Sequence, residues 1–204
     1  RFQWTYPIVL SPREKGVVYA TSQHVWRSAT GGDRWEKISP DLTRGDASTL
    51  GDSGGPITKD HTGVETYGTI FTFAPSPKDR NVMWTGSDDG YVQVTRDKAK
   101  TWTNVTPKDL PEFARISIVE ASPHRAGTAY VAANRYGRGD FQPYVYRTDD
   151  YGQTWTKIVT GVAAGDFARA IREDLKRPKM LYLGTESGIY VSFADGARWE
   201  TLRQ

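Results

Sequence analysis

Short runs of alternating apolar and polar residues, separated by clusters of Gly, Pro, Asp and Ser, dominate the pattern along the chain. The runs are rich in Val, Ile, Thr, Tyr and Trp, and alternation with period two is typical of β-strands. Only Lys108–Ala114 suggests a helical turn. The predicted strands fall into four groups of four: Trp4–Leu10, Val17–Thr21, Val25–Ser28 and Trp35–Ile38; Tyr67–Ala74, Val82–Gly86, Tyr91–Thr95 and Trp102–Val105; Ile116–Ala121, Thr128–Ala133, Tyr144–Thr148 and Trp155–Val159; and Ala168–Arg172, Met180–Gly184, Ile189–Ser192 and Trp199–Leu202.

Two columns of residues recur four times with the same internal spacing. In the first column a hydroxyl residue stands seven positions before a Trp, as in Ser28 and Trp35, Thr95 and Trp102, Thr148 and Trp155, and Ser192 and Trp199. In the second column an aromatic residue stands seven positions after Pro12, Pro77, Pro123 or Leu175, giving Tyr19, Trp84, Tyr130 and Tyr182. Four short strands per repeat is the sequence signature of a β-propeller blade. We therefore predict an all-β propeller, a single region over 1–204 with blades at approximately 1–63, 64–110, 111–160 and 161–204.

Composition narrows the class of protein further. The 204 residues include 27 Lys plus Arg and 24 Asp plus Glu, a net charge of +3, and the two signs are mixed along the chain. Because a nucleic-acid-binding surface usually has its basic residues clustered, no nucleic-acid partner is expected. The chain has no Cys, which excludes disulfides and thiolate catalysis. No apolar run approaches the 18 residues of a membrane-spanning helix, so no membrane insertion is expected.

The third hydroxyl-to-Trp segment resembles a known repeat, the Asp box or BNR repeat, S/T-x-D-x-G-x-x-W. Thr148, Asp150, Gly152 and Trp155 match it in full. The second segment keeps Asp97 but has Ala where the repeat has Gly, and the first and fourth lack the Asp at its usual place. The resemblance implies a turn between the third and fourth strands of a blade, with the Asp accepting backbone N–H groups and the Trp packed between blades.

The whole chain is also similar to large sortilin-like and glycosyl-hydrolase-like BNR-repeat proteins, of which the segment from Trp35 to Thr43 is typical. This resemblance implies an extracellular or periplasmic location and a protein or carbohydrate partner. Such proteins have more than four blades, and the chain opens on Arg1 with no visible secretion leader, so it is expected to be a piece of a longer or processed protein. It could also close as a four-blade ring or associate with a second copy.

Two short motifs point to functions that their context does not support. Gly51–Pro56 spells the nucleophile loop of trypsin-like serine proteases, but only 52 residues precede Ser53, and His24 is the one His among them. A His, Asp and Ser triad needs a preceding barrel, so the protease function is rejected. Arg138–Asp140 spells an integrin-binding tripeptide, which we interpret as part of an exposed loop over Arg135–Gln142.

No metal or cofactor is expected. Asp88 and Asp89 are acidic and followed by Gly, but the alternating ligands of an EF-hand are missing. The three His residues, His24, His61 and His124, are too far apart in sequence to form a ligand set.

Candidate binding and catalytic residues come from the first strand of each blade, because these strands line the central channel of a propeller. They carry acidic candidates for catalysis at Glu65, Glu120 and Glu173, and candidates for ligand binding at Tyr67, Arg115, Arg169 and Arg172. Arg and Glu side chains that converge at a channel mouth suit an anionic or sugar ligand. The favoured function is a non-catalytic binding or scaffolding module, because a fold alone does not fix an activity. The alternative is a glycoside hydrolase, which needs two carboxylates on either side of the sugar.

Overall fold

The computed structural model describes residues 1–54, 57 and 63–202 and has four antiparallel sheets of four strands each. The sheets comprise β1 (Ile8–Leu10), β2 (Val18–Thr21), β3 (Val25–Ser28) and β4 (Glu36–Lys37); β5 (Ile70–Pro75), β6 (Met83–Ser87), β7 (Val92–Thr95) and β8 (Thr103–Asn104); β9 (Arg115–Ala121), β10 (Ala129–Arg135), β11 (Asp140–Thr148) and β12 (Thr156–Lys157); and β13 (Ala168–Glu173), β14 (Leu181–Thr185), β15 (Ile189–Ser192) and β16 (Glu200–Thr201). Two 3-10 turns, η1 (Ala47–Thr49) and η2 (Tyr136–Arg138), complete the assigned elements. The predicted all-β propeller fold is confirmed, and each sheet is one blade.

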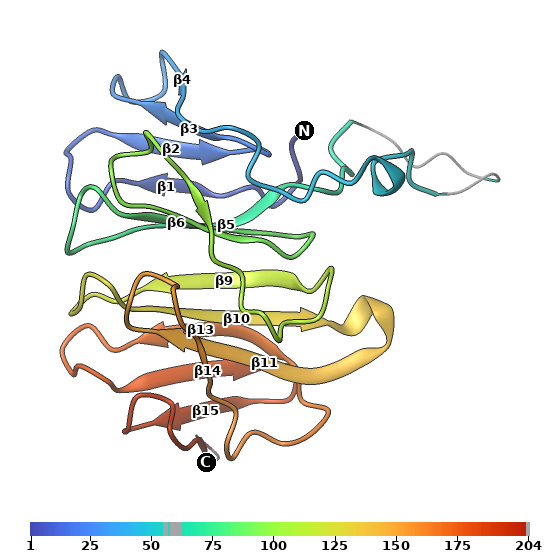
Figure 1. Cartoon of the computed structure of the whole chain (residues 1–204), viewed down its shortest axis with the longest axis vertical. Helices are drawn as coiled ribbons and strands as arrows, with labels where there is room; N and C mark the ends of the chain where they lie inside the picture. The colour runs from blue at the N-terminus through green and yellow to red at the C-terminus, as the bar shows by residue number, and fades with distance from the viewer. Residues whose placement is uncertain (55–56, 58–62, 203–204) are drawn as a thin grey trace.

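The blades follow one another in chain order, with the first and fourth at opposite ends of the stack (Figure 1). Neighbouring blades meet in series, as β2 contacts β5, β5 and β6 contact β9, and β10 contacts β13. The four blades therefore form an open series rather than a closed four-blade ring.

Three apolar clusters hold the series together, one between each pair of neighbouring blades. Tyr19 and Val25 meet Phe73 and Met83 between the first two blades. Trp84 and Val92 of the second blade meet the third in a cluster that includes Val131 and Tyr146, and Tyr130 and Val145 meet Leu183 and Trp199 between the third and fourth. Because the inner blades are covered on both sides, β6 and β7 are buried along their whole length.

The tryptophan column links each blade to the one before it. The indole Nε1 of Trp102 donates to the Ile38 carbonyl at 3.5 Å, that of Trp155 to Val105 at 2.6 Å, and that of Trp199 to Ile158 at 2.7 Å. The aromatic column faces the other way, since Tyr19, Trp84 and Tyr130 lie in the clusters shared with the following blade. Both columns found in the sequence are thus contacts between blades.

The turn between the third and fourth strands has the same hydrogen bonds in the second and third blades. In the third, Thr148 Oγ1 accepts from the Gly152 amide at 2.9 Å, and Asp150 Oδ1 accepts from the Thr154 amide at 2.9 Å. In the second, Asp97 Oδ1 accepts from the Thr101 amide at 2.9 Å, and Ala99 adopts a φ of 68° where the third blade has Gly152. A Cβ on Gly152 would lie 2.7 Å from Val105 of the preceding blade, so this glycine is required by close packing as well as by its φ of 83°.

The fourth blade departs from this turn in an informative way. Ser192 still accepts from the Gly196 amide at 3.0 Å, but Asp195 points out of the turn towards the third blade. Its carboxylate accepts from the Tyr130 hydroxyl at 2.6 Å and from Arg125 Nη2 at 3.0 Å. A side chain that sits one position late in the sequence repeat therefore joins two blades instead of closing its own turn.

Two local expectations were wrong. β1 begins at Ile8 rather than Trp4, because Gln3 instead forms an isolated bridge with Glu65. No helix forms over Lys108–Ala114, a described segment that contains two tight turns closed by hydrogen bonds to the Pro107 and Pro111 carbonyls.

No helix among the described residues is long and apolar enough to cross a membrane.

Candidate functional site

The first strands bring the sequence-predicted residues to two opposite rims of the blades. β9 starts at Arg115 and reaches Glu120 near its end, and β13 has Arg169 near its start and Arg172 and Glu173 at its end. Tyr67 and Arg115 line one cavity, while Glu120 and Arg172 line a different groove. We call the side with Tyr67 and Arg115 the start rim and the side with Glu120 and Arg172 the end rim. The predicted single site is therefore divided between two places.

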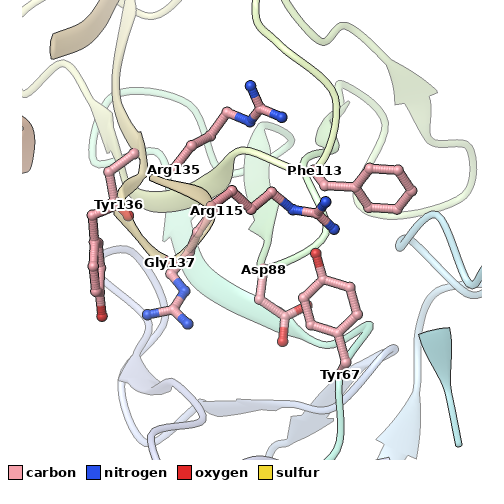
Figure 2. Close-up of a pocket in the computed structure, with 9 residues that line it drawn as sticks. Tyr67, Asp88, Phe113, Arg115, Arg135, Tyr136 and Gly137 are labelled. Carbon is pink, nitrogen blue, oxygen red and sulfur yellow. The ribbon is translucent and has the colours of Figure 1, made fainter. Parts of the chain in front are cut away.

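The start rim holds a cavity of about 220 Å³, shown in Figure 2. β9 supplies Arg115, the β6–β7 hairpin supplies Asp88, and the end of β10 with η2 supplies the opposite wall. The lining residues are Tyr67, Asp88, Phe113, Arg115, Asn134, Arg135, Tyr136, Gly137 and Arg138.

Asp88 is the carboxyl group of this cavity. Its side chain is 2% exposed, and its two oxygens accept from the Thr69 amide at 2.8 Å and the Thr69 hydroxyl at 2.9 Å. Burial is the main influence on the pKa of Asp88 and raises it to about 6, with a further rise from Asp89, although the Thr69 bonds and Arg115 act in the opposite direction. Asp88 can therefore hold a proton in mildly acidic solution, where an ordinary Asp would be ionised.

Asp89 has a different role from its neighbour. Its carboxylate accepts from the Arg44 and Gly45 amides at 2.9 and 3.1 Å and from the Ser87 hydroxyl. These bonds fasten the segment after the first blade to the second blade. No group of three or more metal-ligating side chains occurs within the described parts of the chain.

Arginines give the cavity its positive charge. The Arg115 guanidinium lies over the Phe71 ring at 5.1 Å from its centroid, and Arg138 lies over Phe113 at 4.9 Å. Within the described residues neither guanidinium forms an ion pair, whereas Arg135 is paired with Asp140 at 3.3 Å. In Figure 2 the side chains of Arg115, Tyr67 and Asp88 lie next to one another, with the Tyr67 hydroxyl turned towards the Arg115 guanidinium. Arg115 and Arg138 thus keep a positive charge that no acidic side chain of the described residues pairs with, and such a charge suits an anionic or hydroxyl-rich ligand.

Tyr67 completes the polar wall of the cavity. Burial raises the pKa of its hydroxyl, and the charges of Asp88 and Asp89 raise it further, while Arg138 opposes the shift. The Tyr67 hydroxyl therefore stays protonated at neutral pH and can donate a hydrogen bond to a ligand.

Two other predicted residues near the start rim are already occupied. Arg169 forms an ion pair with Glu186 at 2.6 Å, and its guanidinium lies over the Tyr136 and Phe167 rings. Glu65 accepts a hydrogen bond from the Trp4 indole at 2.9 Å. Neither residue lines the cavity.

The end rim pairs its acidic groups with arginines. Glu120 lies 3.1 Å from Arg172, beside a groove of about 320 Å³. Burial raises the pKa of Glu120 to about 6 against the attraction of Arg172. Glu173 is fully buried: it accepts from the Ser122 hydroxyl and from the Lys179 amide at 2.8 Å, and lies 3.9 Å from Arg125. Glu173 therefore joins blades and is closed to a ligand.

The short motifs behave as their context suggested, with one correction. Ser53 Oγ donates to the Glu65 carbonyl at 3.0 Å, and the last two residues of its motif, Gly55 and Pro56, lie outside the described residues, as does His61. The Arg138–Asp140 tripeptide lies at an exposed connection between β10 and β11, as expected, but this connection is shorter than Arg135–Gln142, because β10 extends to Arg135 and β11 begins at Asp140. The Asp140 carboxylate accepts from Tyr144 at 2.7 Å and is therefore held within its own sheet.

Sequence reasoning did not select Asp88, Phe113 and Arg138, which line this cavity. All three lie in turns, so the rule that first strands line the channel could not select them. The Asp88-Asp89-Gly90 hairpin was a usable signal, since neighbouring carboxylates on a tight turn must be held by backbone donors or by a partner charge.

Comparison with known proteins places this geometry among β-propellers. No protein-family model matches the chain. A probable oligoxyloglucan-reducing end-specific xyloglucanase from Neosartorya fischeri is 29% identical over 133 residues, which cover 60% of this chain and 15% of that protein. The crystal structure of an ancestral GH74 enzyme matches all of this chain and 24% of its own, with a TM-score of 0.72 and 16% identity. YCF48 from Cyanidioschyzon merolae matches 65% of this chain and 36% of its own, with a TM-score of 0.50 and 25% identity. The chain thus has a glycoside-hydrolase-like propeller fold and spans a small part of its longer relatives.

Proposed function

We propose that the chain is a glycan-binding segment of a glycoside-hydrolase-like β-propeller, with the start-rim cavity as its binding site. The observation that carries the proposal is Asp88, a buried carboxyl group of raised pKa that shares its cavity with Arg115 and Arg138, two arginines without ion-pair partners among the described residues. The similarity to a probable xyloglucanase supports a polysaccharide as the ligand class. A cavity of about 220 Å³ is smaller than the usual drug-sized pocket, which favours one sugar unit of a longer glycan over a protein surface.

Each polar group of the cavity has a role in this binding. Arg115 and Arg138 would donate to ring hydroxyls or to a carboxylate, and Tyr67 would donate its hydroxyl proton. Asp88, when protonated, would supply the proton that a leaving glycosidic oxygen takes up, as a general acid of raised pKa does. Glycoside hydrolysis needs a second carboxylate, and Asp88 is the one acidic residue in the described lining of the cavity. We therefore expect this chain to bind a glycan without cleaving it, and cleavage to need a carboxylate from elsewhere in a longer protein.

Two finer assignments belong to the same proposal. The turns at Thr95–Trp102 and Thr148–Trp155 are proposed to be Asp boxes, which their shared pattern of hydroxyl and carboxylate acceptors supports. The protein is proposed to act outside the cytoplasm, in the extracellular space or periplasm, because a polysaccharide ligand does not cross a membrane.

Calorimetric titration with xyloglucan oligosaccharides tests the proposal. We expect the wild-type chain to bind them, and R115A and R138A each to weaken binding about tenfold or more, equivalent to at least about 1.4 kcal/mol. E186Q is the matched control, because Glu186 lies near the same rim but outside the cavity lining. Release of reducing ends is measured in parallel, with D88N as the variant that removes the proton donor. No binding by wild type, or equal binding by R115A, R138A and wild type, would contradict the proposed site.

A further inference from the structure

The first blade exposes a face that the other three blades bury. Strand register aligns one row across each sheet: Phe73, Thr85 and Gln93; Val119, Val131 and Tyr146; and Ile171, Leu183 and Tyr190. Every member of these rows is at most 8% exposed, because each row faces the preceding blade. The equivalent row of the first blade is Ile8, Ala20 and Trp26, in which Ile8 is 64% exposed.

Trp35 shows the same difference. It occupies the position of Trp102, Trp155 and Trp199, whose indoles all donate to a carbonyl of the preceding blade. Trp35 is 43% exposed, and its indole N–H has no acceptor among the described residues. We call Ile8, Ala20, Trp26 and Trp35 the Trp35 face.

Glycine packing identifies the same face independently. Gly152 and Gly196 each press against the preceding blade, at Val105 and Ile158, so that an added Cβ would clash there. Gly32 holds the corresponding turn position in the first blade, and a Cβ there would meet no described atom within 4 Å. The turn therefore keeps its glycine although nothing in the described part of this chain packs on it.

The fourth blade offers the complementary surface. Ile38, Val105 and Ile158, whose carbonyls accept the indole bonds, each stand three positions after a column Trp, and Leu202 stands three positions after Trp199. The Leu202 amide donates to the Ile189 carbonyl at 2.8 Å, as the Ile158 amide does to the Val145 carbonyl. The backbone of Leu202 is therefore held against its third strand in the same way as the backbone of Ile158. Tyr182 is the fourth member of the aromatic column and is partly exposed, whereas Tyr19, Trp84 and Tyr130 are buried against the next blade. We call Tyr182 with the Leu202 carbonyl the Tyr182 face.

We propose that the Trp35 face binds the Tyr182 face of a second copy of this chain, head to tail. The indole of Trp35 would donate to the Leu202 carbonyl of the second copy, and Tyr182 of that copy would pack on the row of Ile8, Ala20 and Trp26. This contact repeats the three junctions already present between the chain's own blades. Two copies joined in this way at both ends would give eight blades, which lies within the usual range of closed propellers.

Sedimentation of the purified chain over a range of concentrations tests the proposal. We expect a dimer for the wild type and at least a tenfold increase in the dissociation constant for W35A and for Y182A. F141A is the control, because Phe141 is 50% exposed but lies on the third blade, away from both faces. Thermal melts of all variants show that each remains folded.

A mixture of W35A and Y182A distinguishes head-to-tail binding from other association. Each mixed pair has one interface with an intact Trp35 and an intact Tyr182, so the mixture should associate more tightly than either variant alone. A chain that stays monomeric would overturn the proposal and leave the Trp35 face to a blade of a longer polypeptide. A dimer insensitive to both substitutions would overturn it as well. Glycan binding does not enter these measurements, so their failure is separate from failure of the proposed function.

Discussion

The two rims of the blades both hold a buried carboxyl group near arginines, yet they differ in how those charges are used. At the end rim Glu120 is paired with Arg172, and Glu173 is enclosed by Ser122, Lys179 and Arg125. At the start rim Asp88 is held by the uncharged Thr69, and Arg115 lies over an aromatic ring with no ion-pair partner in the part of the chain that the structure describes. The acidic groups of the end rim are thus paired with arginines, whereas at the start rim Arg115 and Arg138 have no ion-pair partner among the described residues, and these are the charges that the proposed glycan site would use.

This difference shows why convergence of Arg and Glu is a weak guide to a site. Oppositely charged side chains that lie close together bind one another, and a buried pair then serves the packing of the blades. A binding site needs charges that the fold orients but does not neutralise. Stacking on Phe71 and Phe113 orients Arg115 and Arg138 in this way.

Removal of Glu173 should have the largest effect on stability. In E173A the Ser122 hydroxyl, the Lys179 amide and Arg125 lose a buried acceptor, and the free energy of unfolding should fall by about 3 kcal/mol. Urea denaturation measures the change. The matched control at the other rim is E186A, whose ion pair with Arg169 is exposed and should cost less than about 1 kcal/mol. Equal losses for the two variants would show that the end rim is no more structural than the start rim.

The pH dependence of the free energy of unfolding should report the raised pKa of Asp88. Its pKa in the folded state, about 6, lies above the ordinary Asp value, so the folded chain binds the proton more tightly than the unfolded chain. The resulting stabilisation is fully present below about pH 4 and is lost as the pH rises through 6. The difference between this pKa and the ordinary Asp value corresponds to a stabilisation of about 3 kcal/mol at most.

D88N should remove this contribution. Denaturation curves of wild type and D88N at about pH 4 and about pH 7.5, on either side of the titration, measure the difference. E120Q is the parallel variant at the end rim, because the pKa of Glu120 is also raised to about 6. Each variant should remove its own part of the pH dependence. A D88N profile identical to that of wild type would mean that Asp88 keeps an ordinary pKa.

The sequence was sufficient to predict the fold and insufficient to predict the cavity. Trp102, Trp155 and Trp199 recur at fixed spacing because each makes the same contact with the preceding blade, so the repeat in sequence reports a repeat in packing. Asp88 and Arg138 lie in hairpins that the repeat does not constrain, and their approach to Arg115 depends on how neighbouring blades stack. The separation of Arg115 from Glu120 was within reach, since residues five apart on one extended strand lie about 16 Å apart.

Removing the arginine charge near each raised-pKa carboxyl group, Arg172 near Glu120 and Arg115 near Asp88, should have the smallest effect on stability. It also compares the two rims most directly. The attraction of Arg172 is the main influence that opposes burial at Glu120, whereas Arg115 ranks below burial, Thr69 and Asp89 among the influences on Asp88. R172Q should therefore raise the pKa of Glu120 more than R115Q raises that of Asp88, as followed by carboxyl ¹³C NMR titration. Each substitution should change the free energy of unfolding by less than about 1 kcal/mol, because the guanidinium groups are not fully buried. If R115Q instead caused the larger shift, Arg115 would be bound to Asp88 as Arg172 is to Glu120, and the start rim would have no free charge to offer a ligand.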